Sequence, residues 1–366
     1  MKKKVLTIVA AVLAVALIAG SAVAYKLLPQ PLNYDIDGVT PVGTDVEIVS
    51  ESVDEVTIKK SGDSFKVLAF TDIHLDGKNE TSYMTVENIV KNIEREKPDL
   101  VLFGGDNVTS ALNKKRAHQF AQLFENLGVY WAGVLGNHEG DNGFSLSRAD
   151  MVELFSSYDH CLMKNGVDGI FGNCNYAVTV LNGDDTVKHV YYFLDTGDEM
   201  SSELMQQYNI PEDDPPYDGA KTEQVEWYTA KNDALKEKYG DFKSTLVVHI
   251  PLPQYDNALN DGVTYLYGEK LEGICSSGFD SGLFDALKAG GTTKSVFCGH
   301  DHLNTFGFTY DGILLSYLQP SGYGSYTTAS KLGYEEKDWL QGCTVFELNA
   351  DGTFTQSRLR NCEVNK

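Results

Sequence analysis

Residues 65–74 read FKVLAFTDIH, a run of strand-forming residues that ends in the polar triplet Asp72-Ile73-His74. A second stretch, residues 100–107, reads LVLFGGDN, and its apolar half is followed by Gly104-Gly105-Asp106-Asn107. Short runs of this composition, closed by turn-forming residues, are typical of strands. In open α/β sheets the functional crevice lies outside the carboxyl ends of the strands. The two stretches therefore predict an α/β fold and also the place of its site.

Three more polar clusters follow apolar runs in the same way. They are Gly136-Asn137-His138-Glu139 after residues 129–135, His249 after Val247-Val248, and Gly299-His300-Asp301-His302 after residues 296–298. Each cluster alone has an ordinary explanation as a turn or as a hydrogen-bonded core histidine. Five clusters in one chain, each after a predicted strand, indicate a shared site. We expect the three remaining histidines, His118, His160 and His189, to be solvated on the surface.

The segments between the clusters show helical spacing in the first half of the chain. Apolar residues recur on one helical face in residues 84–93 and again in residues 117–127, and Ser147 with Asp150 could form a capping box for a third helix. This alternation predicts parallel crossovers. The second half is richer in strands: we expect a hairpin around residues 182–185, a long helix over 221–239, and further strands, which are 245–249, 313–318, 344–348 and 353–357.

Composition places the 366-residue chain among globular proteins, with 42% hydrophobic and 22% charged residues. The formal net charge of −22 argues against nucleic acid as a partner, because contacts with phosphate backbone need clustered Lys and Arg. Such a charge is compatible with a protein that holds cations. The six cysteines form no C-x-x-C pair, which argues against a thiol-redox motif, and we expect Cys298 to be a small buried residue.

The N-terminus carries an export pattern. Lys2, Lys3 and Lys4 precede an apolar run, which is followed by Ala22-Val23-Ala24, the order of a secretory signal. The alternative is a retained anchor, because residues 5–24 are long enough to cross a bilayer of about 30 Å. Both hypotheses export the rest of the chain, with membrane contact through residues 5–24 only. We divide the chain into the signal or anchor (1–24), a β-like arm (25–62) and the main domain (63–366).

The residue types in the five clusters are those of a two-metal site. Neutral imidazoles and carboxylates suit Zn, Mn or Fe. Two ions about 3.5–4 Å apart need a shared carboxylate and can clamp a phosphoryl oxygen. Asp106, behind two glycines where backbone can approach closely, meets the demand for that bridge. A histidine beside the ions but not bound to them could protonate a leaving group.

As a set, the five clusters resemble the motifs of the calcineurin-like metallophosphoesterase superfamily. The resemblance implies two metal ions. One set of ligands would be Asp72, His74, Asp106 and His302, and the other Asp106, Asn137, His249 and His300. It makes His138 the unligated catalytic histidine. The implied fold is an α/β four-layer αββα sandwich with two mixed sheets and the dinuclear metal site at the strand carboxyl ends.

The sequence also departs from the family pattern. Many members read Gly-Asp-x-x-Asp, with the second Asp orienting the catalytic histidine, but Thr109 stands there, so the partner of His138 is open. Purple acid phosphatases have Tyr at that position and Gly in place of His74, which argues against an Fe(III)–tyrosinate centre here. The run from Gly136 to Asp141 and the later Gln224-x-x-Trp227 are nevertheless similar to a purple-acid-phosphatase-like subgroup. Residues 321–326 could form a loop near the pocket or a surface turn.

These observations predict an exported hydrolase that cleaves phosphoester bonds by attack of a metal-bound hydroxide. We expect a phosphomonoesterase acting on a phosphorylated substrate whose identity the residues leave open. The closest alternative is a phosphodiesterase, because the same centre serves both reactions. A second alternative, from another class, is a metal-binding surface protein without turnover.

Overall fold

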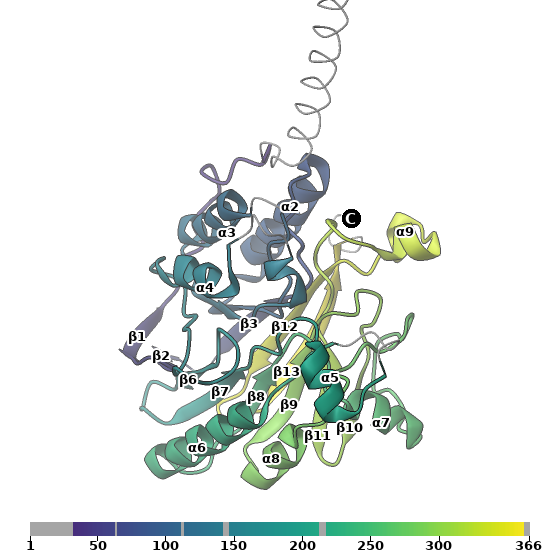
Figure 1. Ribbon diagram of the computed structural model, residues 1–366. Coiled ribbons are helices and arrows are strands. Elements are labelled where there is room, and N and C mark those ends of the chain that lie inside the picture. Colours follow the sequence, from purple (N-terminus) through teal and green to yellow (C-terminus); the bar gives the residue numbers. More distant parts are fainter. Residues whose placement is uncertain (1–31, 63, 111–112, 142–145, 212–216, 362–366) are drawn as a thin grey trace, which may run out of the picture.

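The computed structural model describes residues 32–62, 64–110, 113–141, 146–211 and 217–361 (Figure 1). The predicted signal or anchor, residues 1–24, lies outside these ranges. Within them, no helix combines the length and the apolar character that crossing a membrane requires.

Eight strands form the larger sheet. Their spatial order is β1 (Val46–Glu51), β2 (Glu55–Lys60), β6 (Tyr176–Leu181), β7 (Val187–Phe193), β8 (Ser244–Val247), β9 (Thr293–Cys298), β11 (Ile313–Tyr317) and β10 (Gly307–Tyr310). The strands from β7 through β8 and β9 to β11 run parallel, whereas β1 with β2, β6 with β7, and β10 with β11 are antiparallel. The sheet is therefore mixed, and the predicted N-terminal arm supplies its first two strands.

The smaller sheet has five strands. Their order is β13 (Phe354–Arg360), β12 (Gly342–Leu348), β3 (Phe65–Phe70), β4 (Leu100–Phe103) and β5 (Trp131–Gly133). The strands β3, β4 and β5 are parallel, as the strand–helix alternation predicts, and β12 is antiparallel to β3. The strand predicted over residues 129–135 is shorter than expected, because only its central three residues pair. The C-terminal hairpin completes the sheet that the first half of the chain begins.

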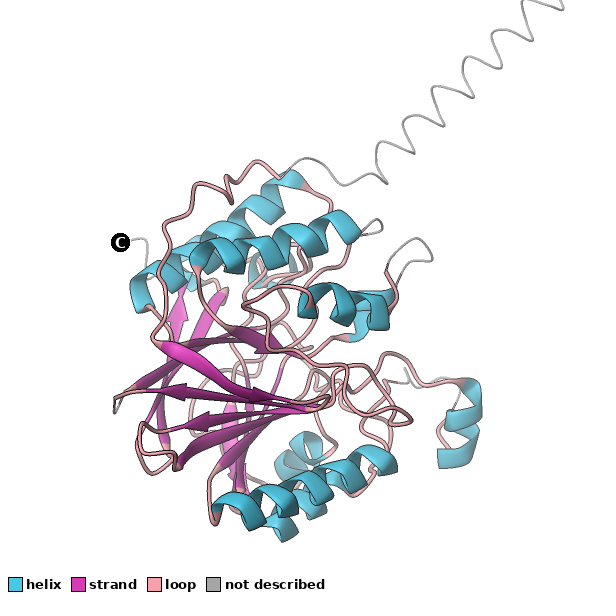
Figure 2. Ribbon diagram, turned by 90° about the vertical axis from the view of Figure 1, so that its left-hand side faces the viewer, coloured by secondary structure: helices cyan, strands magenta, loops and turns pink. Residues whose placement is uncertain are grey.

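Helices cover the outer face of each sheet (Figures 1 and 2). On the smaller sheet they are α2 (Asn79–Glu96), α3 (Lys114–Leu127) and α4 (Arg148–Ser156); on the larger sheet they are α6 (Thr222–Tyr239), α7 (Gln254–Asn260) and α8 (Leu283–Gly290). The connections contain α5 (Ser202–Tyr208), α9 (Thr328–Leu332) and two short 3₁₀ turns, η1 (Asn137–Gly140) and η2 (Glu336–Asp338). The capping box predicted at Ser147 is present, with the Asp150 backbone N–H donating to Ser147 Oγ at 3.1 Å.

The alternation of side chains along the central strands explains the layers. Val247 and Phe297 belong to the core between the two sheets, whereas their neighbours Leu246 and Val296 belong to the core under the helices of the larger sheet. Successive strand residues point to opposite faces, so a strand buried on both faces feeds two cores. Phe297 meets Phe346 of the smaller sheet with ring centroids 4.8 Å apart. The structure is thus the predicted four-layer sandwich with two mixed sheets.

One surface prediction is wrong. His189 on β7 is 1% exposed and lies in the interior rather than in solvent. Its Nδ1 is 2.9 Å from the Gly352 carbonyl oxygen and its Nε2 is 2.9 Å from Thr245 Oγ1, so both ring nitrogens are satisfied. Burial lowers the pKa of His189 to about 4. The imidazole is therefore a neutral core residue, whose partners come from distant segments that the local sequence does not reveal.

The other two histidines of that prediction lie nearer the surface. His118 is exposed, and His160 is half-buried beside Glu125, with its Nδ1 2.9 Å from Glu125 Oε2. Cys298 is buried as expected. The five cysteines in the described ranges are all unpaired; they are Cys161, Cys174, Cys275, Cys298 and Cys343.

Candidate metal centre

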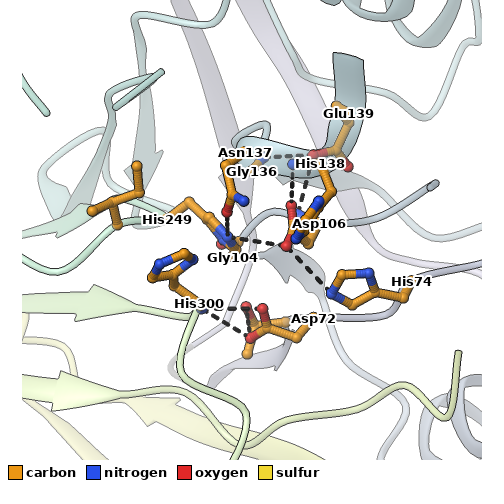
Figure 3. Close-up of polar contacts among 12 residues, drawn as sticks. Asp72, His74, Gly104, Asp106, Gly136, Asn137, His138, Glu139, His249 and His300 are labelled. Carbon is orange, nitrogen blue, oxygen red and sulfur yellow. Dashed lines mark hydrogen bonds and ion pairs between the residues drawn. The ribbon is translucent and has the colours of Figure 1, made fainter. Parts of the chain in front are cut away.

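The five polar clusters meet at one place (Figure 3). Three of them follow β3, β4 and β5 of the smaller sheet, and two follow β8 and β9 of the larger sheet. His249, after β8, contacts Asp106, after β4, so the carboxyl ends of both parallel sets open toward the same edge. The site is therefore assembled from both sheets.

Asp106 stands at the centre of this cluster. Its carboxylate is 1% exposed, and its Oδ2 lies 3.3 Å from His74 Nε2 and 3.3 Å from His249 Nε2. Figure 3 shows the carboxylate between these two rings. Its other oxygen, Oδ1, accepts a hydrogen bond from the His138 backbone N–H at 2.9 Å. One oxygen thus faces both halves of the predicted centre, the arrangement that a bridging ligand needs.

The first predicted ligand set is compact. One ligand atom from each of Asp72, His74, Asp106 and His302 lies within 4.8 Å of the other three, and all four residues are buried. The two Nε2 atoms of His74 and His302 are 3.1 Å apart, and His302 Nε2 is 3.3 Å from Asp72 Oδ1. Two imidazoles and two carboxylates that converge in this way form a donor set suited to Zn, Mn or Fe.

The second predicted set surrounds the other side of Asp106. Asn137 Oδ1 is 3.1 Å from His249 Nε2, the same nitrogen that faces Asp106. The His300 ring lies against His249, with centroids 5.2 Å apart, and the His300 backbone N–H donates to Asp72 Oδ1 at 3.0 Å. All seven predicted ligand residues therefore lie in one cluster, and their division between two ions stays a prediction.

Two histidine rings, those of His249 and His302, have their tautomer set by a hydrogen bond made on the side of the ring that points away from the cluster. His249 Nδ1 is 2.8 Å from the Gly104 carbonyl oxygen, and His302 Nδ1 is 3.2 Å from the Tyr326 carbonyl oxygen. A carbonyl oxygen only accepts, so each Nδ1 must be the donor. This leaves both Nε2 atoms directed into the cluster, and an outer hydrogen bond of this kind orients metal-binding histidines in general.

The pKa values show how strongly the cluster attracts positive charge. Burial opposes ionisation of Asp72, but His302 beside it outweighs burial and lowers the Asp72 pKa to about 2. Burial also opposes protonation of His249, but the Asp106 carboxylate raises the His249 pKa to about 10. Burial, with His249 nearby, lowers the His300 pKa to about 3. Without an ion, protonated imidazoles offset the charge of the two buried carboxylates, and a metal ion fits the same donor atoms once those protons leave.

His138 differs from the other histidines of the cluster. Its side chain is 44% exposed, whereas the side chains of His74, His249 and His302 are 5%, 0% and 6% exposed. Its ring lies beside His74, with centroids 5.4 Å apart. The ring thus borders the cluster and faces solvent, where a substrate would arrive.

Sequence reasoning missed the partner of the His138 ring. His138 Nδ1 lies 2.5 Å from Asp141 Oδ2, three residues further along the chain. This hydrogen bond outweighs the partial burial of the ring and raises the His138 pKa to about 9. The available signal was a carboxylate at i+3 from the histidine in a short glycine-containing turn, which reasoning from the family pattern overlooked.

Glu139 has a role that its place in the motif did not reveal. Its buried carboxylate accepts backbone N–H groups from Gly136 at 2.6 Å and Asp106 at 3.1 Å, and also from Asn107 and Val108. Burial and the nearby Asp106 charge raise the Glu139 pKa to about 7. Glu139 therefore ties the loop after β4 to the turn after β5; the loop carries the predicted bridging ligand, and the turn carries the histidine predicted to be catalytic.

The loop over residues 321–326 lies at the site, the first of its two predicted positions. The backbone N–H groups of Ser321 and Gly322 donate to the carbonyl oxygens of Thr71 and Asp72 at 3.0 and 3.2 Å. The Tyr326 ring stacks on His302, with centroids 4.2 Å apart and planes 7° apart. The loop therefore forms a wall beside the first ligand set.

Comparison with known protein families agrees with this geometry. The model of the calcineurin-like phosphoesterase family matches residues 65–304, which include every residue of the five clusters. The chain therefore belongs to the calcineurin-like phosphoesterase family, a class of metal-dependent phosphoester hydrolases whose fold provides for two metal ions.

Its relatives place the chain in the purple-acid-phosphatase-like subgroup. It is 29% identical over 327 residues to the Arabidopsis thaliana protein named probable inactive purple acid phosphatase 14, covering 79% of this chain and 76% of that protein. It is 31% identical over 284 residues to probable inactive purple acid phosphatase 29 of the same plant, covering 72% and 68%. A solved dimetal phosphatase from Danio rerio aligns with a TM-score of 0.48 and 15% identity, over 82% of this chain and 100% of that one.

Proposed function

We propose that the protein is a phosphomonoesterase that uses two metal ions and His138. The observation that supports this most is the combination of a buried carboxylate–imidazole cluster with one partly exposed histidine that borders it. A site built only to store or sense metal has no need of that histidine. Mn, Fe or Zn are the ions that the donor set suits.

The chain's own residues would divide the work as follows. Asp72, His74, Asp106 and His302 would hold one ion, and Asp106, Asn137, His249 and His300 the other. When bound, such an ion pair supplies a nucleophile at neutral pH and neutralises phosphoryl oxygens. The backbone of His138 is fixed by Asp106, and its ring can give a proton to the oxygen that leaves phosphorus.

An assay panel tests the proposal against its two alternatives. The full chain without residues 1–24 is loaded with Mn, Fe or Zn and given nitrophenyl phosphate, an alkyl phosphate and bis-nitrophenyl phosphate, with metal content measured in parallel. We expect faster hydrolysis of the monoesters. Preference for the diester would identify a phosphodiesterase. Bound metal without turnover would identify a metal-binding protein. Absence of turnover is what the word "inactive" in the relatives' names suggests for those proteins.

The proposed role of His138 has its own test. His138→Ala should keep both ions and lose about 10²–10⁴-fold in kcat, the usual range for a general acid. The loss should be larger on an alkyl phosphate than on nitrophenyl phosphate, because a nitrophenol leaves easily as an anion. An equal loss on both substrates would assign the ring to stabilising the phosphoryl oxygens. Loss of metal would show that His138 is a ligand.

We also propose that the domain acts outside the cytoplasm. The support is the order of basic, apolar and small residues in residues 2–24.

A further inference from the structure

We propose that Asp141 positions the ring of His138. It would replace the second aspartate of the Gly-Asp-x-x-Asp pattern, whose position is occupied by Thr109 in this chain. The inference rests on the proposed function, because it concerns how the acid of that reaction is held.

The turn η1 brings the two side chains together. It is a 3₁₀ turn over residues 137–140, with Asp141 as its C-terminal cap. Side chains at i and i+3 eclipse one another in a 3₁₀ turn, because three residues complete it. His138 and Asp141 are such a pair, and Asp141 Oδ2 lies 2.5 Å from His138 Nδ1.

The turn is itself held rigidly. Glu139 accepts the Gly136 backbone N–H at 2.6 Å, Asp106 Oδ1 accepts that of His138 at 2.9 Å, and Arg148 Nη1 donates to the Gly136 carbonyl oxygen at 2.5 Å. These bonds fix the backbone on both sides of the ring, but none of them fixes the ring.

The ring needs a separate anchor because packing does not confine it. The His138 side chain is 44% exposed, and in the described part of the chain its only side-chain hydrogen-bond partner is Asp141. A carboxylate can only accept from Nδ1–H, so this contact leaves Nε2 as the nitrogen that can reach the leaving oxygen. In catalytic triads, a hydrogen bond to a third group orients the base in the same way.

Stability alone does not explain the pair. The side chains of His138 and Asp141 are 44% and 39% exposed, and exposed ion pairs contribute little to folding. If orientation is the function of Asp141, its removal should lower kcat with only a small shift of the thermal midpoint, because solvent screens the pair. If the pair had only a structural role, Asp141→Ala would not lower kcat, and its effect on kcat would not depend on the residue at position 138.

The test is a double-mutant cycle on the metal-loaded enzyme. Asp141→Ala should lower kcat about 10–100-fold with KM and metal content little changed, and Asp141→Asn should lie between it and the wild type, because its amide oxygen still accepts. In the His138→Ala background, Asp141→Ala should cause no further loss. The control is Asp198→Asn, which removes the same charge from a half-buried carboxylate close enough to affect His138 electrostatically but not bonded to it.

Three results would overturn the inference. The first is a wild-type kcat in both Asp141 variants. The second is that the losses in kcat of Asp141→Ala and His138→Ala are fully additive. The third is that Asp198→Asn lowers kcat as much as Asp141→Asn does.

A second readout separates this inference from the proposed function. Two-bond ¹H–¹⁵N spectra of the metal-free protein, taken at alkaline pH where the ring is neutral, report which nitrogen of His138 carries the proton. We expect the Nδ1–H tautomer in the wild type and the Nε2–H tautomer, which free histidine prefers, in Asp141→Ala. If the wild type hydrolyses no ester but this change is seen, the function fails and the positioning stands. If the tautomer is the same in both proteins, the positioning fails whatever the activity.

Discussion

Asp106 is the residue on which we expect the predicted metal centre to depend most. One of its carboxylate oxygens faces a histidine from each predicted ligand set, and the other accepts the backbone N–H of His138 in the turn η1. Two neighbouring cations need a shared anion to offset their repulsion. Burial by itself would keep this carboxyl neutral, but the adjacent His249 and His74 hold its pKa well below the usual range.

Asp106→Asn should therefore lower metal content at both positions and reduce the rate to that of the metal-free protein. An amide has the size of the carboxylate but lacks the charge that holds two cations. Metal analysis by mass spectrometry, together with the hydrolysis rate, measures the effect.

Asp99→Asn is the matched control. Asp99 is a buried aspartate at the opposite end of β4, where it pairs with Lys60 at 2.6 Å and accepts the Lys66 backbone N–H at 2.8 Å. We expect it to lose stability and keep its metal. Full occupancy and a near-normal rate in Asp106→Asn would contradict the bridging role.

At the scale of elements, the loops after the strands approach each other so closely that glycine is required. A Cβ on Gly136 would lie 2.1 Å from Asp106 Oδ1, and one on Gly105, whose φ is +98°, would lie 2.4 Å from His249 Nδ1. Contacts this short do not occur between real side chains. The glycines therefore let the loops after β4, β5 and β8 meet around one small volume.

Gly136→Ala should displace Asp106 and weaken metal binding, with a folded domain retained. The control is Gly140→Ala in the same turn, where the nearest atom to the new Cβ is Arg148 Cγ at an ordinary 3.6 Å. Isothermal titration of Mn into both metal-free variants measures the difference. Equal affinity in the two would show that the close approach at Gly136 does not matter for the ions.

The elements and the ligand cluster could be predicted from sequence because their signals are local. Apolar runs mark the strands, and the polar residues that follow each run mark the site. Asp141 escaped because the expected position of the partner was Thr109, and Glu139 because its bonds to backbone N–H groups leave no pattern in side-chain types. The pairing of β12 with β3 also escaped, since it joins segments far apart in the chain.

At the scale of the whole molecule, the packing of the two sheets creates the site and also buries a titratable group. His189 on β7 bonds to Gly352, in the turn before β13, and to Thr245 on β8. Its burial was not predictable from the local sequence, because Lys188 and His189 are adjacent polar residues in β7 and both partners of the His189 ring come from distant segments.

His189 should make the fold sensitive to acid. The folded pKa of about 4 lies below the unfolded value of about 6.5, so only the unfolded state gains this proton as the pH falls between them. The free energy of unfolding should therefore decrease, by up to about 3 kcal/mol from this group, between pH 7 and pH 4. His189→Gln should remove that part of the slope in urea unfolding series. Parallel pH slopes in the two proteins would contradict the assignment.

The N-terminal pattern leads to a prediction for the intact chain in its cell. Residues 25–366 should be digested by a protease added to intact cells, or be found in the medium, because both hypotheses for residues 1–24 export them. A cytosolic marker protein digested only after lysis is the control. Complete protection of the chain, together with its recovery in the cytosolic fraction, would refute export.

The central claim is that this chain is a two-metal phosphoester hydrolase, and titrating metal-free protein with Mn while following nitrophenyl phosphate hydrolysis tests it most directly. The seven predicted ligand residues, clustered around the Asp106 carboxylate, predict a rate that rises with added ion and levels off at about two equivalents per chain. A rate that levels off at one equivalent would contradict the two-metal centre. Ions bound without any hydrolysis, with Mn, Fe and Zn alike, would contradict the activity.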